Sequence, residues 1–375
     1  MIRVLNITEE GRGGGALFRI ITVSKNISDE VHTIVVGPKD PVDFQNRMKG
    51  AGVEFRVMRM YSLSRSPYRL FLYLLNFIPE VISLVRIIRR LRPDIIHVNG
   101  SWQFKGILSS WITGKHSIWH LNDTHQSFFV RRLFSIFSVV PRGFIFASQR
   151  TKNYYSSLIK KYAEKQSFVI PATISIPDDI SARKYPSTKQ KWKGLMIGYI
   201  NRNKGIEHII EGASALKKSE VDVDIIGPVI NTQASYWNTL VELKERNEAS
   251  NISFLGFKEI TKELFQEYDF YICSSNNESS PLAVWQAMAH GLPIVSMDVG
   301  DVKNVIDQYQ CGVMIESFNS SDLVRAIHDF LDLDCKIKNT MSRSSIQASR
   351  EIFDIEVVKK EYISMYRSII GESDN

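Results

Sequence analysis

The feature that most constrains the fold is a repeated alternation of short runs rich in Val and Ile with segments of helix length. Six such runs occupy the first part of the chain: 2–8, 31–37, 93–100, 115–121, 142–148 and 167–173. Apolar strands that alternate with helices form parallel sheets covered on both faces. The pattern therefore predicts a doubly wound α/β domain.

The alternation is interrupted once and then restarts. Residues 175–193 carry prolines, mixed charge and small polar side chains, which is typical of a linker. Six further apolar runs follow: 194–200, 221–228, 251–257, 269–275, 292–299 and 312–316. Since 375 residues also favour two domains, we expect one over 1–174 and a second over 194–350. We expect the last helix, 355–371, to pack back on the first domain.

Composition narrows the class of partner. The chain is 44% hydrophobic, which indicates a packed globular protein, and its net charge of +7 attracts anions such as nucleic acid, acidic lipid or phosphorylated small molecules. No run of five or six like charges occurs, so nucleic acid is not an expected partner.

The cysteines and the N-terminus indicate a compartment. Cys273, Cys311 and Cys335 are odd in number and widely spaced, which favours reduced thiols over disulfides or a metal site. The first ten residues lack the apolar core and cleavage pattern of a signal peptide. We therefore expect a cytoplasmic location.

The segment NNESSPLAVWQAMAHGLPIV, residues 276–295, contains the first candidate site. Ser280 and Pro281 are helix-start residues and Gly291 ends the helix, so its amino end lies at the carboxyl edge of the sheet. Free N–H groups there favour a phosphate. Glu278, just before this end, would be repelled by phosphate and suits sugar hydroxyls better. The plainer interpretation is a capped helix with Gln286 on its surface.

Two further stretches suit phosphate groups. In GYINRNKG, residues 198–205, Arg202 and Lys204 stand at the start of a helix, where cations oppose the helix dipole and are a poor choice for stability alone. In EEGRGGGALFRI, residues 9–20, three consecutive glycines, Gly13 to Gly15, let the backbone approach a ligand. Ordinary solvated or flexible turns are the alternative for both.

Together these stretches resemble glycosyltransferase family 4, retaining enzymes of the GT-B fold that use nucleotide-sugar donors. The family signature is a glutamate, seven residues, a second glutamate, then Ala-Met-Ala and Gly-x-Pro; here Glu278 and Gln286 are followed by AMAHGLPIV. The segments NKG, IGP and FLGF precede it in the family's order. The resemblance covers most of the chain, is strongest over 194–316, and implies two doubly wound Rossmann-like domains facing each other across a cleft.

The resemblance implies roles in donor binding. Glu278 would contact the donor sugar, and Gln286, where the family usually has glutamate, would bind the ribose without a charged bond. Lys204 matches the diphosphate-binding lysine. Tyr199 stands where the family has arginine, and Arg202 could substitute for it. The implied donor-binding residues are Gly14, Gly15, Gly198, Arg202, Lys204, Gly256, Phe257, Glu278, Leu282, Ala283 and Gln286.

The family's catalytic histidine is harder to place. In the segment WHLND, residues 119–123, one register puts Asn122 on the histidine and Asp123 on the aspartate that follows it; a shifted register uses His120. A buried strand histidine is the plainer interpretation of His120. The catalytic candidates are His120, Asn122, Asp123 and Glu278.

The implied reaction is retaining transfer of a hexose-type sugar from a nucleotide-diphosphate sugar to an acceptor hydroxyl, in bacterial-type surface polysaccharide or glycolipid assembly. The nucleotide sugar is a substrate, and we expect no cofactor and no metal, because cations and helix amides can stabilise the leaving diphosphate. Two alternatives stay open: a catalytically silent GT-B partner subunit, favoured by the joint departures at Gln286, Tyr199 and Asn122, and a GT-B sugar-nucleotide isomerase.

The expected acceptor is a saccharide or a lipid-linked molecule. Residues 66–92 and 127–137 combine aromatic, aliphatic and arginine side chains, a composition suited to an anionic membrane surface. The apolar run 71–85 is broken by Asn76, Pro79 and Glu80 and falls short of a membrane span. We expect peripheral contact with the inner face of the membrane; amphipathic helices packed on the sheet are the alternative.

Overall fold

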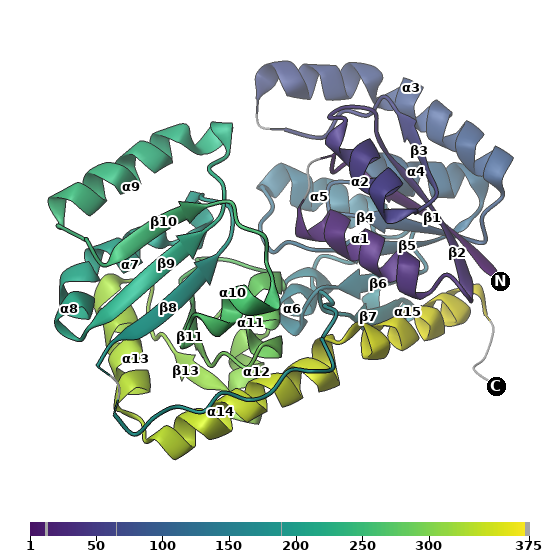
Figure 1. Cartoon of the computed structure of the whole chain (residues 1–375). Coiled ribbons are helices and arrows are strands. Elements are labelled where there is room, and N and C mark those ends of the chain that lie inside the picture. Colours follow the sequence, from purple (N-terminus) through teal and green to yellow (C-terminus); the bar gives the residue numbers. More distant parts are fainter. Residues whose placement is uncertain (12–13, 65, 189, 372–375) are drawn as a thin grey trace. The chain divides into compact units, whose positions relative to one another are not determined.

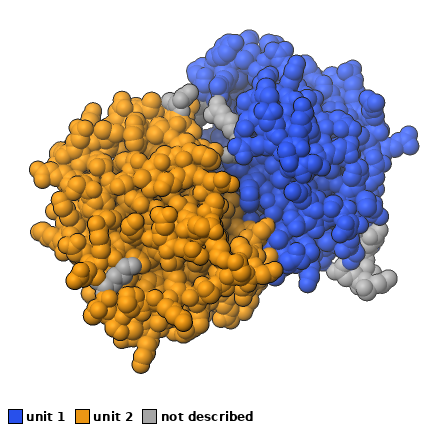
Figure 2. Space-filling view, in the orientation of Figure 1, with its two compact units in different colours: residues 1–173, 355–375 blue, residues 174–354 orange. Residues whose placement is uncertain are grey.

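The computed structural model describes residues 1–11, 14–64, 66–188 and 190–371. The chain forms two compact units (Figure 2): unit 1 comprises Met1–Thr173 and Ile355–Asn375, and unit 2 comprises Ile174–Asp354. The chain therefore passes from one unit to the other twice. Each unit is a parallel sheet with helices on both faces (Figure 1). This confirms the predicted doubly wound α/β class.

The sheet of unit 1 has the strand order β3-β2-β1-β4-β5-β6-β7. The strands are β1 (Ile2–Thr8), β2 (Val31–Pro38), β3 (Phe55–Met58), β4 (Ile95–Asn99), β5 (His116–Leu121), β6 (Gly143–Phe146) and β7 (Gln166–Val169). The helices are α1 (Gly15–Asn26), α2 (Asp43–Ala51), α3 (Pro67–Leu91), α4 (Phe104–Thr113), α5 (Phe128–Phe137), α6 (Gln149–Ser156), η1 (Tyr162–Glu164) and α15 (Ile355–Ile370).

Both faces of this sheet are buried, and consecutive strand residues alternate between two cores. On β5, Ile118 belongs to the core beneath α15, and its neighbour Trp119 belongs to the opposite core. The C-terminal helix α15 supplies Tyr362, Met365 and Ile369 to the first core. A segment far away in the sequence thus completes one face of the unit 1 sheet.

The sheet of unit 2 has the order β10-β9-β8-β11-β12-β13. The strands are β8 (Trp192–Ile197), β9 (Val221–Ile226), β10 (Ile252–Gly256), β11 (Phe270–Cys273), β12 (Ile294–Ser296) and β13 (Gly312–Met314). The helices are η2 (Arg202–Lys204), α7 (Ile206–Glu211), α8 (Ala213–Lys218), η3 (Asn231–Gln233), α9 (Ala234–Arg246), α10 (Lys262–Gln266), α11 (Leu282–Ala289), α12 (Val302–Tyr309), α13 (Ser320–Asp332), α14 (Cys335–Ala348) and η4 (Ser349–Phe353).

Two local features differ from the sequence pattern. Strand β3 was not predicted, because it is a short, partly exposed edge strand that pairs with β2 and carries little apolar periodicity. The helix expected after Gly205 is divided into α7 and α8, with Gly212 between them. Glycine weakens a helix interior, which fits this division.

The stretch 175–193 makes specific contacts within unit 2. Arg183 Nη2 donates to the carbonyl oxygen of Phe265 over 2.5 Å, and Tyr185 Oη donates to that of Asp269 over 2.5 Å. The ring of Tyr185 stacks against Trp192, at 6.2 Å between centroids. These contacts hold the stretch against the sheet it precedes.

Replacing Ile369 with alanine should destabilise unit 1. The side chain is fully buried, and its Cδ1 lies 3.0 Å from the position of a Cβ built on Gly143 of β6. Loss of such a side chain leaves a cavity and costs about 2–5 kcal/mol. Chemical denaturation should show this loss, while Glu361→Ala, at an exposed position of the same helix, should change the free energy of unfolding little. Equal effects of the two substitutions would contradict the packing of α15 on this sheet.

Candidate functional site

The most informative polar contact in unit 2 lies where the strand order of its sheet reverses. Lys204 follows β8 and Glu278 follows β11, and these two strands are neighbours in the sheet. Lys204 Nζ donates to Glu278 Oε1 over 2.8 Å. Ligands of open parallel sheets bind outside the carboxyl ends of the strands at such a reversal. The two residues singled out by sequence spacing are therefore brought together at this edge.

The ion pair is largely shielded from water. The side chains of Lys204 and Glu278 are 19% and 22% exposed. Burial opposes the charged form of Lys204, but the adjacent Glu278 carboxylate outweighs it and raises the pKa of Lys204. Ser275 Oγ also donates to Glu278 Oε1, over 3.3 Å. Lys204 thus keeps its positive charge at neutral pH.

The glycine after β8, Gly198, leaves room for the Lys204 side chain. A Cβ on Gly198, just after β8, would lie 2.7 Å from Lys204 Cε. Any side chain at position 198 would therefore displace the lysine. Gly256 ends β10 with a left-handed φ of +65°, and Phe257 after it is 79% exposed.

The turn after β8 and the loop after β11 are joined by hydrogen bonds. The backbone N–H of Asn276 donates to the carbonyl oxygen of Asn203 over 2.7 Å, and the side chain of Asn203 donates to the carbonyl oxygen of Asn277. Arg202 lies with its guanidinium carbon 5.1 Å from the ring centroid of Tyr236. Arg202 therefore sits over an aromatic ring of α9, while Lys204 contacts Glu278.

Helix α11 begins one residue later than its sequence suggests. Its N-cap is Pro281 and no side chain caps it, whereas Ser280 Oγ accepts a hydrogen bond from Trp285 Nε1 over 3.0 Å. The predicted cap at Ser280 is wrong because this indole takes its hydroxyl. Leu282 and Ala283 form the first turn, whose N–H groups have no partner within the helix. Gln286 lies farther along the helix and is half-buried.

In unit 1, the Glu10 carboxylate lies against part of the glycine loop that follows β1. A Cβ on Gly14 would clash with Glu10 Oε1, so any other residue here would require the Glu10 side chain to move. Gly15 opens α1, and no atom lies within 4 Å of where its Cβ would be. Gly13, the first of the three glycines, lies outside the described residues. The structure thus gives a packing reason for Gly14 only.

The catalytic candidate His120 is part of a buried chain of hydrogen bonds. It lies on β5, is fully buried, and its Nε2 contacts Arg19 Nη1. Arginine only donates, so this nitrogen accepts, and the imidazole proton is on Nδ1, 3.2 Å from His97 Nε2. His97 Nδ1 then donates to Tyr366 Oη over 2.7 Å. Burial, followed by the charge of Arg19, lowers the pKa of both histidines well below its usual value.

Asn122 and Asp123 lie just beyond the end of β5. Arg19 Nη1 donates to Asn122 Oδ1 over 2.8 Å, so the amide nitrogen of Asn122 is the part left to donate elsewhere. Asp123 accepts from Ser101 Oγ over 2.5 Å and from Tyr155 Oη over 2.6 Å. Burial raises the pKa of Asp123 against these two hydrogen bonds. Asp123 therefore ties its loop to two neighbouring elements, whereas Asn122 faces a cavity.

This cavity has a volume of about 730 Å³ and is lined entirely by residues of unit 1. Its walls include Glu9 and Glu10 after β1, Asn99 after β4 and Asn122 after β5. Strands β1 and β4 are neighbours, and the strand order of this sheet reverses between them. The cavity thus lies at the position in unit 1 that corresponds to the Lys204–Glu278 pair in unit 2.

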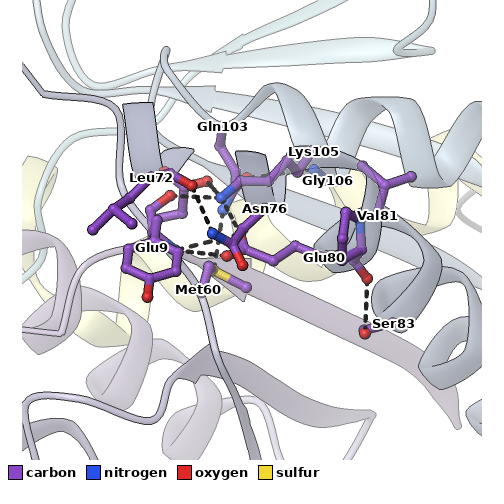
Figure 3. A network of polar contacts seen from close by, with 12 residues as sticks. Glu9, Met60, Leu72, Asn76, Glu80, Val81, Ser83, Gln103, Lys105 and Gly106 are labelled. Atoms are coloured by element: carbon purple, nitrogen blue, oxygen red, sulfur yellow. Dashed lines mark hydrogen bonds and ion pairs between the residues drawn. The ribbon is translucent and has the colours of Figure 1, made fainter. Parts of the chain in front are cut away.

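The sequence analysis missed the buried charges of unit 1. Arg19, Glu80 and Lys105 are buried on helices α1, α3 and α4. Each is a single charged residue among apolar neighbours in the sequence. A single charge on the apolar face of a predicted helix is the signal that could have identified them. Their partners could not be named, because they lie on other elements; Lys105, for instance, pairs with Glu80 and Glu9 (Figure 3).

Asp222 and Asp224, two residues apart on β9, each have a protein partner. Asp222 Oδ2 lies 2.8 Å from Lys191 Nζ, and Asp224 Oδ2 accepts from Tyr268 Oη over 2.9 Å. Among the described residues, no group of three or more His, Cys, Asp or Glu side chains is placed to hold a metal ion.

Comparison with known proteins now identifies the family. The model of the family "Glycosyl transferases group 1" matches residues 178–348, which is nearly all of unit 2. Unit 2 thus matches the group 1 glycosyltransferases, and the chain is a glycosyltransferase of the GT-B type. The resemblance to family 4 is confirmed at this level.

The matches to individual relatives cover both units of the glycosyltransferase. It is 23% identical to the N,N'-diacetylbacillosaminyl-diphospho-undecaprenol alpha-1,3-N-acetylgalactosaminyltransferase of Campylobacter jejuni, over 94% of each chain. The crystal structure of Anabaena HepE in complex with UDP-glucose is similar, with a TM-score of 0.82 and 18% identity over 98% of this chain and 100% of that chain. Sucrose-phosphate synthase of Thermosynechococcus elongatus has a TM-score of 0.77, at 14% identity over 98% and 99%. The structural likenesses show a common fold.

Proposed function

We propose that this glycosyltransferase moves a hexose-type sugar, with retention of configuration, from a nucleoside-diphosphate sugar to an acceptor hydroxyl. The observation that carries the proposal is the Lys204–Glu278 pair at the strand-order reversal of unit 2, next to the first turn of α11. A cation and free helix N–H groups suit a diphosphate, and a carboxylate beside them suits sugar hydroxyls. The binding of UDP-glucose by HepE supports a donor of this class.

The donor site is proposed to work without a metal. As the bond from the sugar to the diphosphate breaks, negative charge grows on the leaving group and the sugar gains oxocarbenium character. Lys204 and the N–H groups of Leu282 and Ala283 can stabilise this negative charge without moving from their present positions. Gln286 is proposed to bind the ribose, and Gly198, Gly256 and Phe257 to border the nucleotide. Arg202 is a second proposed phosphate-binding cation, and Gly14 and Gly15 are proposed phosphate contacts.

Asn122 is the proposed catalytic-site residue of unit 1. Its side chain lines the cavity with its oxygen held by Arg19, so it can donate to a ligand. Asp123 is proposed to hold the loop that carries it, and His120 to hold Arg19 from within the sheet. The three sequence candidates thus take different proposed roles.

The acceptor is proposed to belong to surface polysaccharide or glycolipid assembly, at the cytoplasmic face of a membrane. The name of the Campylobacter jejuni relative, which describes a lipid-linked acceptor, supports this. Contrary to the expectation for residues 71–85, helix α3 is long and apolar enough to cross a membrane by length and composition. It nevertheless buries one face, including Val81, Leu84 and Ile88, against unit 1. That packing favours a helix lying on a membrane surface over one that spans it.

The outer face of α3 has the composition of an interfacial helix. Its exposed apolar side chains are Tyr68, Leu70, Phe71, Leu74, Leu75, Ile78 and Ile82. They recur at helical spacing, and the last turns of the helix carry exposed Arg86, Arg89 and Arg90. Apolar side chains flanked by arginines suit an anionic bilayer surface. Phe128 and Phe129 are also exposed, at the start of α5.

Nucleotide release is the direct test of the proposed reaction. The protein should release a nucleoside diphosphate from at least one member of a panel of UDP-, GDP-, ADP- and dTDP-hexoses, and a chelator should leave the rate unchanged. The anomeric configuration of the product, measured by NMR, should match that of the donor. Absence of binding and release across the panel would favour a silent partner subunit, and strict dependence on Mg²⁺ or Mn²⁺ would refute metal-free stabilisation of the leaving group.

Lys204→Ala should weaken binding of the nucleoside diphosphate recognised in that panel. A charge-assisted hydrogen bond to phosphate contributes about 1.5–3 kcal/mol, or roughly a ten- to hundredfold change in Kd. Isothermal titration should show this loss, and Lys218→Ala, at the exposed end of α8 in the same unit, should not. In Lys204→Ala the Glu278 carboxylate is left unpaired and would repel the phosphate; the double variant Lys204→Ala, Glu278→Gln removes this repulsion. Normal affinity in the single variant would contradict a diphosphate site at this turn.

The proposed membrane surface can be tested by flotation with vesicles of phosphatidylethanolamine and phosphatidylglycerol. The parent protein should float with the vesicles, and the double variant Phe71→Ser, Leu75→Asn should bind at least about tenfold more weakly, since each inserted apolar side chain contributes ~1.5–3 kcal/mol. Matched substitutions at exposed apolar positions of unit 2, Phe318→Ser and Ile337→Asn, should leave flotation unchanged. Equal flotation of both double variants would contradict a membrane-binding role of α3.

A further inference from the structure

We propose that Tyr366, on the C-terminal helix α15, is a positioning residue for Asn122, the proposed catalytic-site residue of unit 1. The proposal rests on the proposed glycosyl transfer, and it adds the groups that set the direction of the Asn122 amide. Tyr366 acts through a chain of hydrogen bonds that passes through His97, His120 and Arg19 to Asn122. The last helix of the unit is thus linked to a residue that lines its cavity.

The links of this chain are buried side chains from four different elements. Arg19 belongs to α1, His97 to β4, His120 to β5 and Tyr366 to α15, and none of them is more than 5% exposed. The two imidazole rings are 5.4 Å apart between centroids, with 17° between their planes. Buried polar groups find their hydrogen-bond partners among their neighbours in the protein. Each donor of the chain therefore needs the acceptor that the next link supplies.

The chain has one direction. A guanidinium only donates, so His120 Nε2 accepts from Arg19, and the single proton of the neutral imidazole is on Nδ1. This N–H donates to His97 Nε2 over 3.2 Å, which puts the His97 proton on Nδ1, 2.7 Å from Tyr366 Oη. Burial, followed by the charge of Arg19, lowers the pKa of both histidines, so both are neutral at neutral pH. Tyr366 is the acceptor at the end of the chain.

This terminal acceptor decides which tautomers are stable. Without the Tyr366 hydroxyl, the Nδ1–H of His97 would be a buried donor with no acceptor, which is costly. The other tautomer of His97 has its proton on Nε2, where it would face the Nδ1–H of His120. If the His120 proton then moved to Nε2, it would oppose the N–H groups of Arg19. Loss of one hydroxyl on α15 therefore weakens the anchor of the Arg19 guanidinium.

Arg19 transmits this change to the cavity. Its Nη1 contacts both His120 Nε2 and Asn122 Oδ1, and its Nη2 donates to Asn99 Oδ1 over 2.6 Å. The bond to Asn122 determines which end of the amide is held and which end is left to donate. A guanidinium that shifts away from His120 would change this bond. Small displacements of groups that contact a substrate lower the rate of its reaction.

Helix α15 offers a matched control. Tyr362, about one turn before Tyr366, is equally buried, and its ring centroid lies 6.3 Å from that of His97. Its hydroxyl oxygen makes no hydrogen bond within the described part of the chain. Tyr362→Phe and Tyr366→Phe therefore remove the same atom from the same helix, but only Tyr366→Phe removes a link of the chain.

The first experiment reads the chain directly, without a substrate. NMR of protein labelled with ¹⁵N in histidine distinguishes protonated from unprotonated ring nitrogens, and the side-chain amide signals of Asn122 report its hydrogen bond. In the parent, His97 and His120 should both be neutral and protonated on Nδ1. Tyr366→Phe should give a mixture of tautomers and shift the Asn122 amide signals, whereas Tyr362→Phe should match the parent.

The second experiment measures nucleotide release from the donor sugar that the protein recognises. Tyr366→Phe should lower kcat roughly tenfold or more and leave the Kd for nucleoside diphosphate unchanged, because Lys204 lies in unit 2. In an Asn122→Ala background, Tyr366→Phe should lower kcat no further, because both substitutions act on the same group. Tyr362→Phe should release nucleotide at the parent's rate.

Several results would overturn the proposal. They are a parent protein with the His120 proton on Nε2, unchanged histidine and Asn122 signals in Tyr366→Phe, equal changes in Tyr362→Phe, or a full further loss of kcat when Tyr366→Phe is added to Asn122→Ala. Absence of nucleotide release in the parent would count against the proposed function instead, and the NMR experiment would still test the chain.

Discussion

The reversal of strand order in a parallel sheet is the constraint on which both candidate sites depend. Connections from the two strands at the reversal lead to opposite faces, so the chain departs from that edge in two directions and leaves the strand ends uncovered. In unit 2 this happens between β8 and β11, and Lys204 and Glu278 meet there. In unit 1 it happens between β1 and β4, beside Glu9 and Asn99. The same backbone rule thus places a cation and a carboxylate in one unit and a carboxylate and an amide in the other.

Buried charges fix the walls of the unit 1 cavity before any ligand binds. Arg19 donates to Asn99 Oδ1 over 2.6 Å and to Asn122 Oδ1 over 2.8 Å, so a buried guanidinium is satisfied by neutral acceptors and orients both amides. Lys105 is satisfied by two carboxylates and a carbonyl oxygen. Removing one partner from such a set leaves an uncompensated buried charge, which is costly. These contacts therefore hold the side chains in defined positions, as recognition of a small polar ligand requires.

Helix α3 connects the cavity of unit 1 with the proposed membrane surface. Tyr68, Arg69 and Leu72 line the cavity near its beginning, and Phe71 and Leu75 lie on its exposed face. Glu80, on its buried face, pairs with Lys105 beside Glu9. A ligand in the cavity and a bilayer at the outer face would thus contact the same helix. This arrangement suits an acceptor that is attached to a membrane lipid, and it is the physical link between the proposed acceptor and the proposed location.

Much of the architecture was predictable from the sequence, because strand runs, crossover helices and the signature around Glu278 are patterns of near neighbours. The fold class and the family followed from them. The edge strand β3 could not be predicted because its apolar periodicity is weak. The start of α11 could not be predicted because the Trp285 indole binds the Ser280 hydroxyl. The polar networks of unit 1 were beyond sequence reasoning for a different reason. Arg19 contacts Asn99 and His120 across separations of 80 and 101 residues, and Lys105 meets Glu80 across 25. Local patterns determined which segments become strands and helices, but only tertiary packing decided which buried charges meet, because those distances close when the sheet assembles.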